Sequence, residues 1–136
     1  MSNSHVNQNA SPTTLVTTAE TVAVVMSAFS PNNPQGEGVC LEGLLNLTAG
    51  TGTTAFTIRC YRGAGVVGSA PTGLTPVGGG QGVGGGGGNA PFQFLDPTAL
   101  VLNNQAWTIT VQATGATANG TVNNAIVEAT SCVVGE

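Results

Sequence analysis

Charged residues are scarce in this sequence. They make up 6% of its 136 residues, lysine is absent, and the only arginines are Arg59 and Arg62. Nucleic-acid binding depends on many lysine and arginine contacts with phosphates, and an anionic membrane surface attracts clusters of the same residues. No run approaches the roughly 20 apolar residues of a membrane span. Neither nucleic acid nor a membrane is therefore an expected partner.

Residues that favour helices are equally few. Without lysine, and with little Glu, Arg and Leu, surface helices have little to be built from. Thr, Val, Ala, Gly and Asn are common instead; Thr and Val favour strands, whereas Gly and Asn favour turns. Because 40% of the residues are hydrophobic, the chain can also fill a core. The composition predicts a single all-β domain.

The N-terminus lacks the features of a secretory signal. Residues 1–12 have no basic start and no apolar run, and they end in Ser11-Pro12. We therefore expect synthesis and folding in a cytoplasm, from which the protein can be released as part of a larger particle. Residues 1–12 are expected to form an extended arm that is either disordered or laid along a neighbouring subunit.

Cysteine is scarce too, and the odd number of three leaves at least one unpaired. The neighbours of Cys40, Cys60 and Cys132 are apolar and typical of strands. Buried free thiols are therefore the expected state, and a single disulfide bond is the alternative.

Segments with strand character recur along the rest of the chain. Period-two alternation, which indicates a strand with one face on a core, is clearest over residues 53–62 and 106–112. The core-facing residues of these two segments are expected to be Phe56, Ile58 and Cys60, then Trp107, Ile109 and Val111. Further strands are expected at 15–16, 21–29, 39–47, 66–67, 91–95 and 121–134, the last with Val122, Ile126, Cys132 and Val134 as core candidates.

About eight strands separated by turn clusters predict an antiparallel β-sandwich of the jelly-roll type. An immunoglobulin-like sandwich is the alternative; it is less favoured because Trp107 lies on the wrong strand relative to the cysteines. Residues 13–136 are expected to form this one domain. Within it, residues 68–90 are so rich in glycine that we expect a surface loop.

The sequence offers little for catalysis. The single histidine, His5, lies in the polar arm, where it cannot be held with the accuracy that general-base catalysis requires. No aspartate-rich loop suggests calcium, and three scattered cysteines with His5 do not have zinc spacing. Gly82 to Gly87 satisfies G-x-G-x-x-G only trivially, because no strand precedes it and no helix follows. We expect no enzyme activity, no metal and no cofactor.

The near absence of charge points instead to contacts between subunits. Few charges oppose association of long strands, and the mean hydropathy is +0.22. Arg and Tyr are enriched at interfaces, although a solvated Arg paired weakly with Glu42 or Glu128 is an equal alternative for Arg59. The candidate interface residues are Leu15, Val16, Arg59, Tyr61 and Arg62.

Two stretches carry a resemblance to a known class of proteins. Leu47 to Gly63, LTAGTGTTAFTIRCYRG, resembles a hairpin of small jelly-roll proteins of virions and phages, and Trp107 to Val122, WTITVQATGATANGTV, resembles their final hairpin. The two stretches together comprise 33 of the 136 residues of the chain. The glycine run departs from that pattern.

The resemblance implies a virion structural protein, either a capsid decoration (cement) protein or a small coat protein. Residues 1–12 contain no Lys or Arg, whereas a coat protein that packages nucleic acid usually has a basic arm. Decoration is therefore favoured, with the chain itself, as a trimer, and a major capsid protein as partners. The alternatives are a receptor- or carbohydrate-binding head and an extracellular filament or adhesin subunit.

Overall fold

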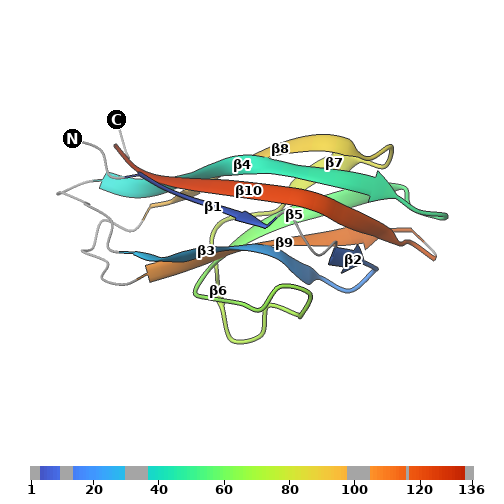
Figure 1. Ribbon diagram of the computed structural model, residues 1–136, viewed down its shortest axis with the longest axis horizontal. Helices are drawn as coiled ribbons and strands as arrows, with labels where there is room; N and C mark the ends of the chain where they lie inside the picture. Colours follow the sequence, from blue (N-terminus) through green and yellow to red (C-terminus); the bar gives the residue numbers. More distant parts are fainter. Residues whose placement is uncertain (1–3, 10–13, 30–36, 98–104, 116, 134–136) are drawn as a thin grey trace.

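The computed structural model describes residues 4–9, 14–29, 37–97, 105–115 and 117–133. Within these ranges the chain forms ten strands and no helix, and so no helix long and apolar enough to cross a membrane. The strands make two antiparallel sheets that face each other (Figure 1). The predicted all-β antiparallel sandwich is confirmed.

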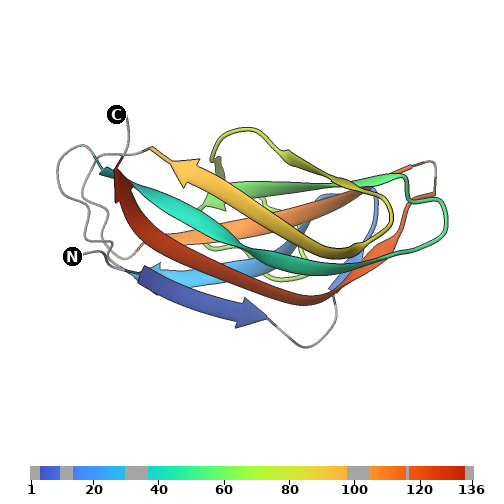
Figure 2. The same cartoon turned by 90° about the horizontal axis from the view of Figure 1, so that it is seen from above.

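The first sheet, called sheet A here, has the strand order β1–β10–β4–β8, and β2 pairs with β10 next to β1. Its strands are β1 (Ser4–Asn9), β2 (Thr14–Val16), β4 (Glu37–Ala49), β8 (Gly88–Asp96) and β10 (Gly120–Val133). Figure 2 shows this sheet from its outer side, with β10, β4 and β8 lying side by side.

The second sheet, sheet B, has the order β3–β9–β5, and β6 and β7 both pair with β5. Its strands are β3 (Thr21–Phe29), β5 (Ala55–Arg62), β6 (Thr75–Pro76), β7 (Gln81–Gly84) and β9 (Gln105–Thr114). The strand pairs are nested within one another along the chain. The innermost is β5 with β6 and β7, followed outward by β4 with β8, β3 with β9, and finally β1 and β2 with β10. That nesting is the topology of a jelly roll.

The core lies between the sheets and is built by alternate residues of each strand. Phe56, Ile58 and Cys60 of β5 are buried, as the alternation predicts. Trp107, Ile109 and Val111 of β9 are buried as well. The other buried apolar side chains of this core include Val24, Met26, Val39, Leu41, Leu45, Leu47, Phe92, Phe94, Val122 and Val127.

The core assignment in β10 needs a correction. Ile126 was expected to face the core, but its side chain is 37% exposed, whereas Ala125, Val127 and Ala129 are buried. The register between β10 and β4 shifts between Val122 and Asn124. Because a bulge inserts one residue, every side chain beyond it changes face. Cys132 and Val134 were also core candidates, and their side chains lie outside the described residues.

The segment between β5 and β8 differs from expectation. No strand forms at Val66 and Val67, which are exposed in a turn. The glycine-rich residues 68–90 include the short strands β6 and β7, and Val77 within them is buried. Val77 and Val83 interrupt the glycines and pack against the core, so part of this segment is held against the sandwich.

Part of the expected N-terminal arm forms a strand. Residues 4–9 form β1 and pair with β10 of their own chain.

The described cysteines differ in their state. Cys60 is a buried free thiol, as expected. Cys40 is disulfide-bonded, so the expectation of free thiols is wrong for that residue.

Candidate functional site

An ion pair between the half-buried Arg62 and the buried Asp96 joins the two sheets at one end of the core. Nε and Nη2 of Arg62 donate hydrogen bonds to the two carboxylate oxygens of Asp96, at 2.8 and 2.6 Å. Nε1 of Trp107 donates a third, at 2.9 Å. Asp96 is fully buried, and the hydrogen bonds that its carboxylate accepts hold the pKa of the Arg62 guanidinium above its usual value.

Asp96 directly precedes Pro97, a position where aspartate commonly forms turns, yet it ends β8 and is a buried partner of Arg62. Charge-assisted, bidentate hydrogen bonds from Arg are among the strongest in proteins, so we assign this cluster a structural role. The weak acidic partners considered for Arg59 were Glu42 and Glu128; both lie on sheet A, and Arg59 forms its ion pair with Glu20 instead.

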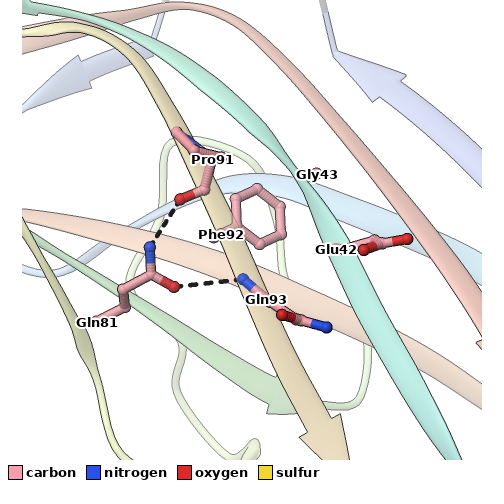
Figure 3. Close-up of a pocket in the computed structure, with 6 residues that line it drawn as sticks. All are labelled: Glu42, Gly43, Gln81, Pro91, Phe92 and Gln93. Carbon is pink, nitrogen blue, oxygen red and sulfur yellow. Dashed lines mark hydrogen bonds between the residues drawn. The ribbon is translucent and has the colours of Figure 1, made fainter.

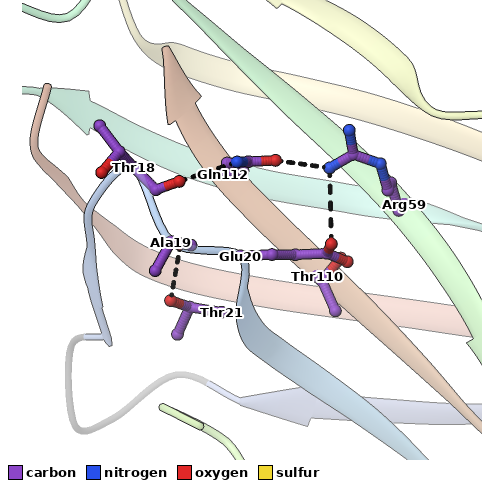
Figure 4. A network of polar contacts seen from close by, with 7 residues as sticks. All are labelled: Thr18, Ala19, Glu20, Thr21, Arg59, Thr110 and Gln112. Atoms are coloured by element: carbon purple, nitrogen blue, oxygen red, sulfur yellow. Dashed lines mark hydrogen bonds and ion pairs between the residues drawn. The ribbon is translucent and has the colours of Figure 1, made fainter. Parts of the chain in front are cut away.

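The second arginine belongs to a polar network on the outer face of sheet B (Figure 4). Arg59 Nη1 donates to Oε1 of Gln112 at 2.7 Å and lies 3.6 Å from Oε1 of Glu20. Thr110 Oγ1 donates to the other oxygen of Glu20 at 2.6 Å. Gln112 in turn donates to the carbonyl of Thr18 at 2.8 Å. The network fastens the segment before β3 across β9 and β5.

Two further groups have strongly raised pKa values. Burial raises the pKa of the Cys60 thiol to about 12, with the nearby Asp96 carboxylate adding to the effect. Burial and a hydrogen bond with Glu20 raise the pKa of Tyr61 to about 12. Both groups are therefore neutral near pH 7, and Cys60 is not a reactive thiolate.

The outer face of sheet B is covered by the chain itself. The loop after β5 passes beneath this sheet (Figure 1), where the amide of Gly65 donates to Oγ1 of Thr108 and that hydroxyl donates to the carbonyl of Gly63. Thr108 and Thr110 face outward, yet both are fully buried. Sheet B therefore offers little free surface over β9.

The outer face of sheet A is open by contrast. No described segment crosses β10, β4 or β8 on that side (Figure 2). Two large apolar side chains of this face are exposed, Leu95 by 43% and Ile126 by 37%. The strand registers place Leu44 between Ile126 and Pro91, and Glu42 between Glu128 and Gln93. We define the sheet A face by these residues: Glu42, Leu44, Pro91, Gln93, Leu95, Ile126 and Glu128.

A shallow pocket opens at the β8 side of this face (Figure 3). It has a volume of about 530 Å³ and is lined by Glu42, Gly43, Gln81, Pro91, Phe92 and Gln93. Gln81 closes one wall: its Nε2 donates to the carbonyl of Pro91 at 2.7 Å, and its Oε1 accepts from the amide of Gln93 at 3.3 Å. The amide group of Gln81 is thus occupied within the chain.

Asparagines form a ladder at the other end of the face. Asn46 donates from Nδ2 to Oδ1 of Asn89 at 2.7 Å, and Asn123 donates to Oδ1 of Asn46 at 3.0 Å. Asn123 also donates to Oγ1 of Thr48 at 2.7 Å. These side chains link β8, β4 and β10 without any charge.

The predicted interface residues fall in different environments. Leu15 is 66% exposed, whereas Val16 beside it is fully buried. Arg59 and Tyr61 lie together on the outer face of sheet B, beside Glu20. Arg62 is held by Asp96. The structure thus brings Arg59 and Tyr61 together and separates them from Leu15.

The sheet A face was not among the predicted interface residues. Its signal in the sequence is weak, because Ile126 looks like an ordinary core residue until the register of β10 is known; only the alternation of Leu95 with Phe92 and Phe94 points to an outward apolar residue. Among the residues the structure describes, no three His, Cys, Asp or Glu side chains gather as they would around a metal ion. The side chain of His5 lies outside those residues.

No protein-family model matches the chain, and no curated protein matches it. A solved structure of Bacillus endospore appendages, described as a novel family of disulfide-linked pili, is similar with 19% identity over 96% of this chain and 91% of that chain, at a TM-score of 0.32.

The structure of infectious bursal disease virus Gx strain is similar with 14% identity and a TM-score of 0.44. That similarity covers 99% of this chain and 33% of the viral chain, so the present chain spans about a third of that protein's length. At such identities and TM-scores neither similarity assigns a function to this chain.

Proposed function

We propose that this chain is a non-catalytic structural protein that assembles through the sheet A face, and that its role is that of a capsid decoration protein. In this role it binds other copies of itself, as a trimer, and the outer surface of a viral or phage capsid. It is made in the host cytoplasm and ends on the virion. The contacts between subunits stabilise the particle.

The observation that carries the proposal is the contrast between the two outer faces. Sheet B is covered by the chain's own loop and by the Arg59 network, so Thr108 and Thr110 are buried there. Sheet A has no such cover among the described residues, and it exposes Leu95 and Ile126. Apolar side chains left exposed on an uncovered sheet face mark a candidate interaction surface.

The charge distribution supports a structural partner over a nucleic acid. The net charge is −4, and no lysine exists to contact phosphates. On the sheet A face the charged groups are the carboxylates of Glu42 and Glu128, which are paired in register across β4 and β10. Like charges directly opposite each other are unfavourable across strands. A partner that donates hydrogen bonds or positive charge to this pair would relieve that repulsion.

The test combines a variant with a matched control. Ile126→Lys places a charge on the sheet A face, whereas Val66→Lys places the same charge on an exposed apolar residue of the loop under sheet B. Sedimentation velocity should show a smaller species for Ile126→Lys and the wild-type species for Val66→Lys. Loss of assembly with both variants, or with neither, contradicts assembly through this face.

The decoration role needs a second measurement. Purified capsids that lack the protein are mixed with the chain and sedimented, and the fraction of bound protein is measured. We expect the wild-type chain and Val66→Lys to sediment with the capsids and Ile126→Lys to remain in solution. A wild-type chain that stays in solution, as a monomer, would favour a ligand-binding module instead.

A further inference from the structure

The edges of the two sheets are closed in different ways. An open strand edge presents unpaired N–H and C=O groups that can pair with another chain. At one side of the sandwich, the side chain of Gln81 in β7 occupies backbone hydrogen-bonding groups of β8. Its side chain donates to the carbonyl of Pro91 and accepts from the amide of Gln93, both on β8. Pro91 itself has no N–H to offer.

The edge of β3 is occupied by the loop after β5. The amide of Val22 donates to the carbonyl of Ser69 at 2.8 Å, and the amide of Gly68 donates to the carbonyl of Val22 at 2.9 Å. This loop belongs to the middle of the chain and is joined at both ends to the sandwich. It cannot be exchanged without unfolding its flanking strands.

The edge of β10 is closed differently, by the N-terminal strand. β1 pairs with β10 over six positions, from Ser4 with Thr130 to Asn9 with Ala125. β2 pairs with the same edge further along, where Val16 lies opposite Gly120. Since β1 lies at the edge of its sheet (Figure 2) and pairs there with β10 alone, it can leave without disturbing the pairing of any other strands. Five of its six residues are polar, so its departure exposes little apolar surface of its own.

We propose that β1 is an exchangeable strand, and that the β10 edge accepts residues 4–9 of a second copy of this chain in the register seen within the chain. Exchange between identical copies replaces each backbone hydrogen bond with an equivalent one, so its free-energy cost is small. Residues 10–13 join β1 to the buried Val16 through Thr14 and Leu15. This inference rests on the proposed self-assembly and names a contact that would hold it together.

The experiment uses two variants that each carry one added cysteine, so that the two added thiols can be linked only between chains; Cys40 remains disulfide-bonded in both. Val6 lies opposite Glu128 in the β1–β10 register. Chains carrying Val6→Cys and chains carrying Glu128→Cys, both in a Cys60→Ala background, are mixed, unfolded, refolded together and treated with a short thiol-reactive cross-linker. The control replaces Glu128→Cys with Glu42→Cys, which lies in the same row one strand further from β1.

Exchange predicts a cross-linked dimer of the Val6→Cys and Glu128→Cys chains, at least about ten-fold more abundant than the dimer formed with the Glu42→Cys control. Neighbouring strands lie about 5 Å apart, so the control cysteine, one strand further away, is about twice as far from Val6→Cys. The native mass of the same mixture is measured before linking. An oligomer without the cross-link overturns the exchange and leaves the proposed function standing. A monomer at every concentration overturns both.

Discussion

Arg62 and Asp96 form a bidentate ion pair that links the end of β5 in sheet B to the end of β8 in sheet A. The carboxylate also accepts a hydrogen bond from the indole of Trp107. Arg62 shares the core-facing side of β5 with Cys60, and Asp96 shares that of β8 with Phe94. At this end of the core the two charged groups therefore meet each other's hydrogen-bonding requirements between the sheets.

Removing the arginine should destabilise the protein strongly. In Arg62→Met the Asp96 carboxylate stays buried without its cation, and breaking such a pair costs about 3–5 kcal/mol in the free energy of unfolding. Arg59→Met, two residues away on the outer face, should cost no more than about 1 kcal/mol, because its ion pair with Glu20 is partly exposed. Urea unfolding followed by tryptophan fluorescence measures both; equal losses would contradict the structural role of Asp96.

Alkaline pH should weaken the fold through Cys60. In the folded protein its thiol keeps the proton up to about pH 12, whereas the unfolded thiol loses it near 9.0. Between these values the unfolded state binds fewer protons, so the free energy of unfolding falls as pH rises. The contribution is complete below pH 9 and declines by roughly 1.4 kcal/mol per pH unit above it.

The variant Cys60→Ala should show a shallower decline over the same range. Ile58→Val is the matched control on the same face of β5: loss of one methylene lowers stability by about 0.5–1.5 kcal/mol at every pH and leaves the slope unchanged. Tyr61, whose pKa is also raised to about 12, remains in both variants. If the slope of Cys60→Ala equals that of the wild type, the thiol is not the source of the decline.

A side chain at Gly43 should not be accommodated. A Cβ built there would lie 2.0 Å from the carbonyl oxygen of Ile126 and 2.8 Å from Cζ of Phe92. Overpacking of this kind costs about 1–3 kcal/mol or more, so Gly43→Ala should lower the thermal unfolding midpoint clearly. Gly82→Ala, where no atom lies within 4 Å, should leave it nearly unchanged. A tolerated Gly43→Ala would show that β4 and β10 are further apart.

The disulfide of Cys40 has a predicted partner. In the β4–β10 ladder Cys40 pairs with Thr130, and Gly38 pairs with Cys132. Diagonal neighbours of this kind lie close enough for long or flexible side chains to meet, and Cys60 is free. Peptide mapping without reductant should therefore find the Cys40 peptide joined to the Cys132 peptide of the same chain. A Cys40 peptide linked between chains would contradict this.

Much of the fold follows from local alternation in the sequence. Residues 21–29 were expected as a strand and form β3 with the same bounds. The inward rows of β5 and β9 were predicted because apolar residues alternate there with Thr and Arg. The same alternation places Arg62 on the core-facing side of β5, and it places Asp96, two residues after Phe94, on the core-facing side of β8. These two positions could have suggested the ion pair from the sequence alone.

The open face could not be predicted in the same way. Whether Ile126 points inward depends on the bulge after Val122, which is set by pairing with a strand some 80 residues earlier in the chain. The alternation in β9 predicts that Thr108 and Thr110 face solvent. Nothing in this strand shows that the loop after β5 and Glu20 cover them. The bond of Cys40 depends likewise on the long-range register of β4 and β10.

The proposed association of the chain with copies of itself through the sheet A face is tested most directly by multi-angle light scattering of the purified chain over a hundred-fold range of concentration. We expect a stable species of three times the 13.4 kDa chain mass, which Ile126→Lys shifts toward the monomer and Val66→Lys leaves intact. A mass of 13.4 kDa at all concentrations, with or without the lysine on this face, would contradict it.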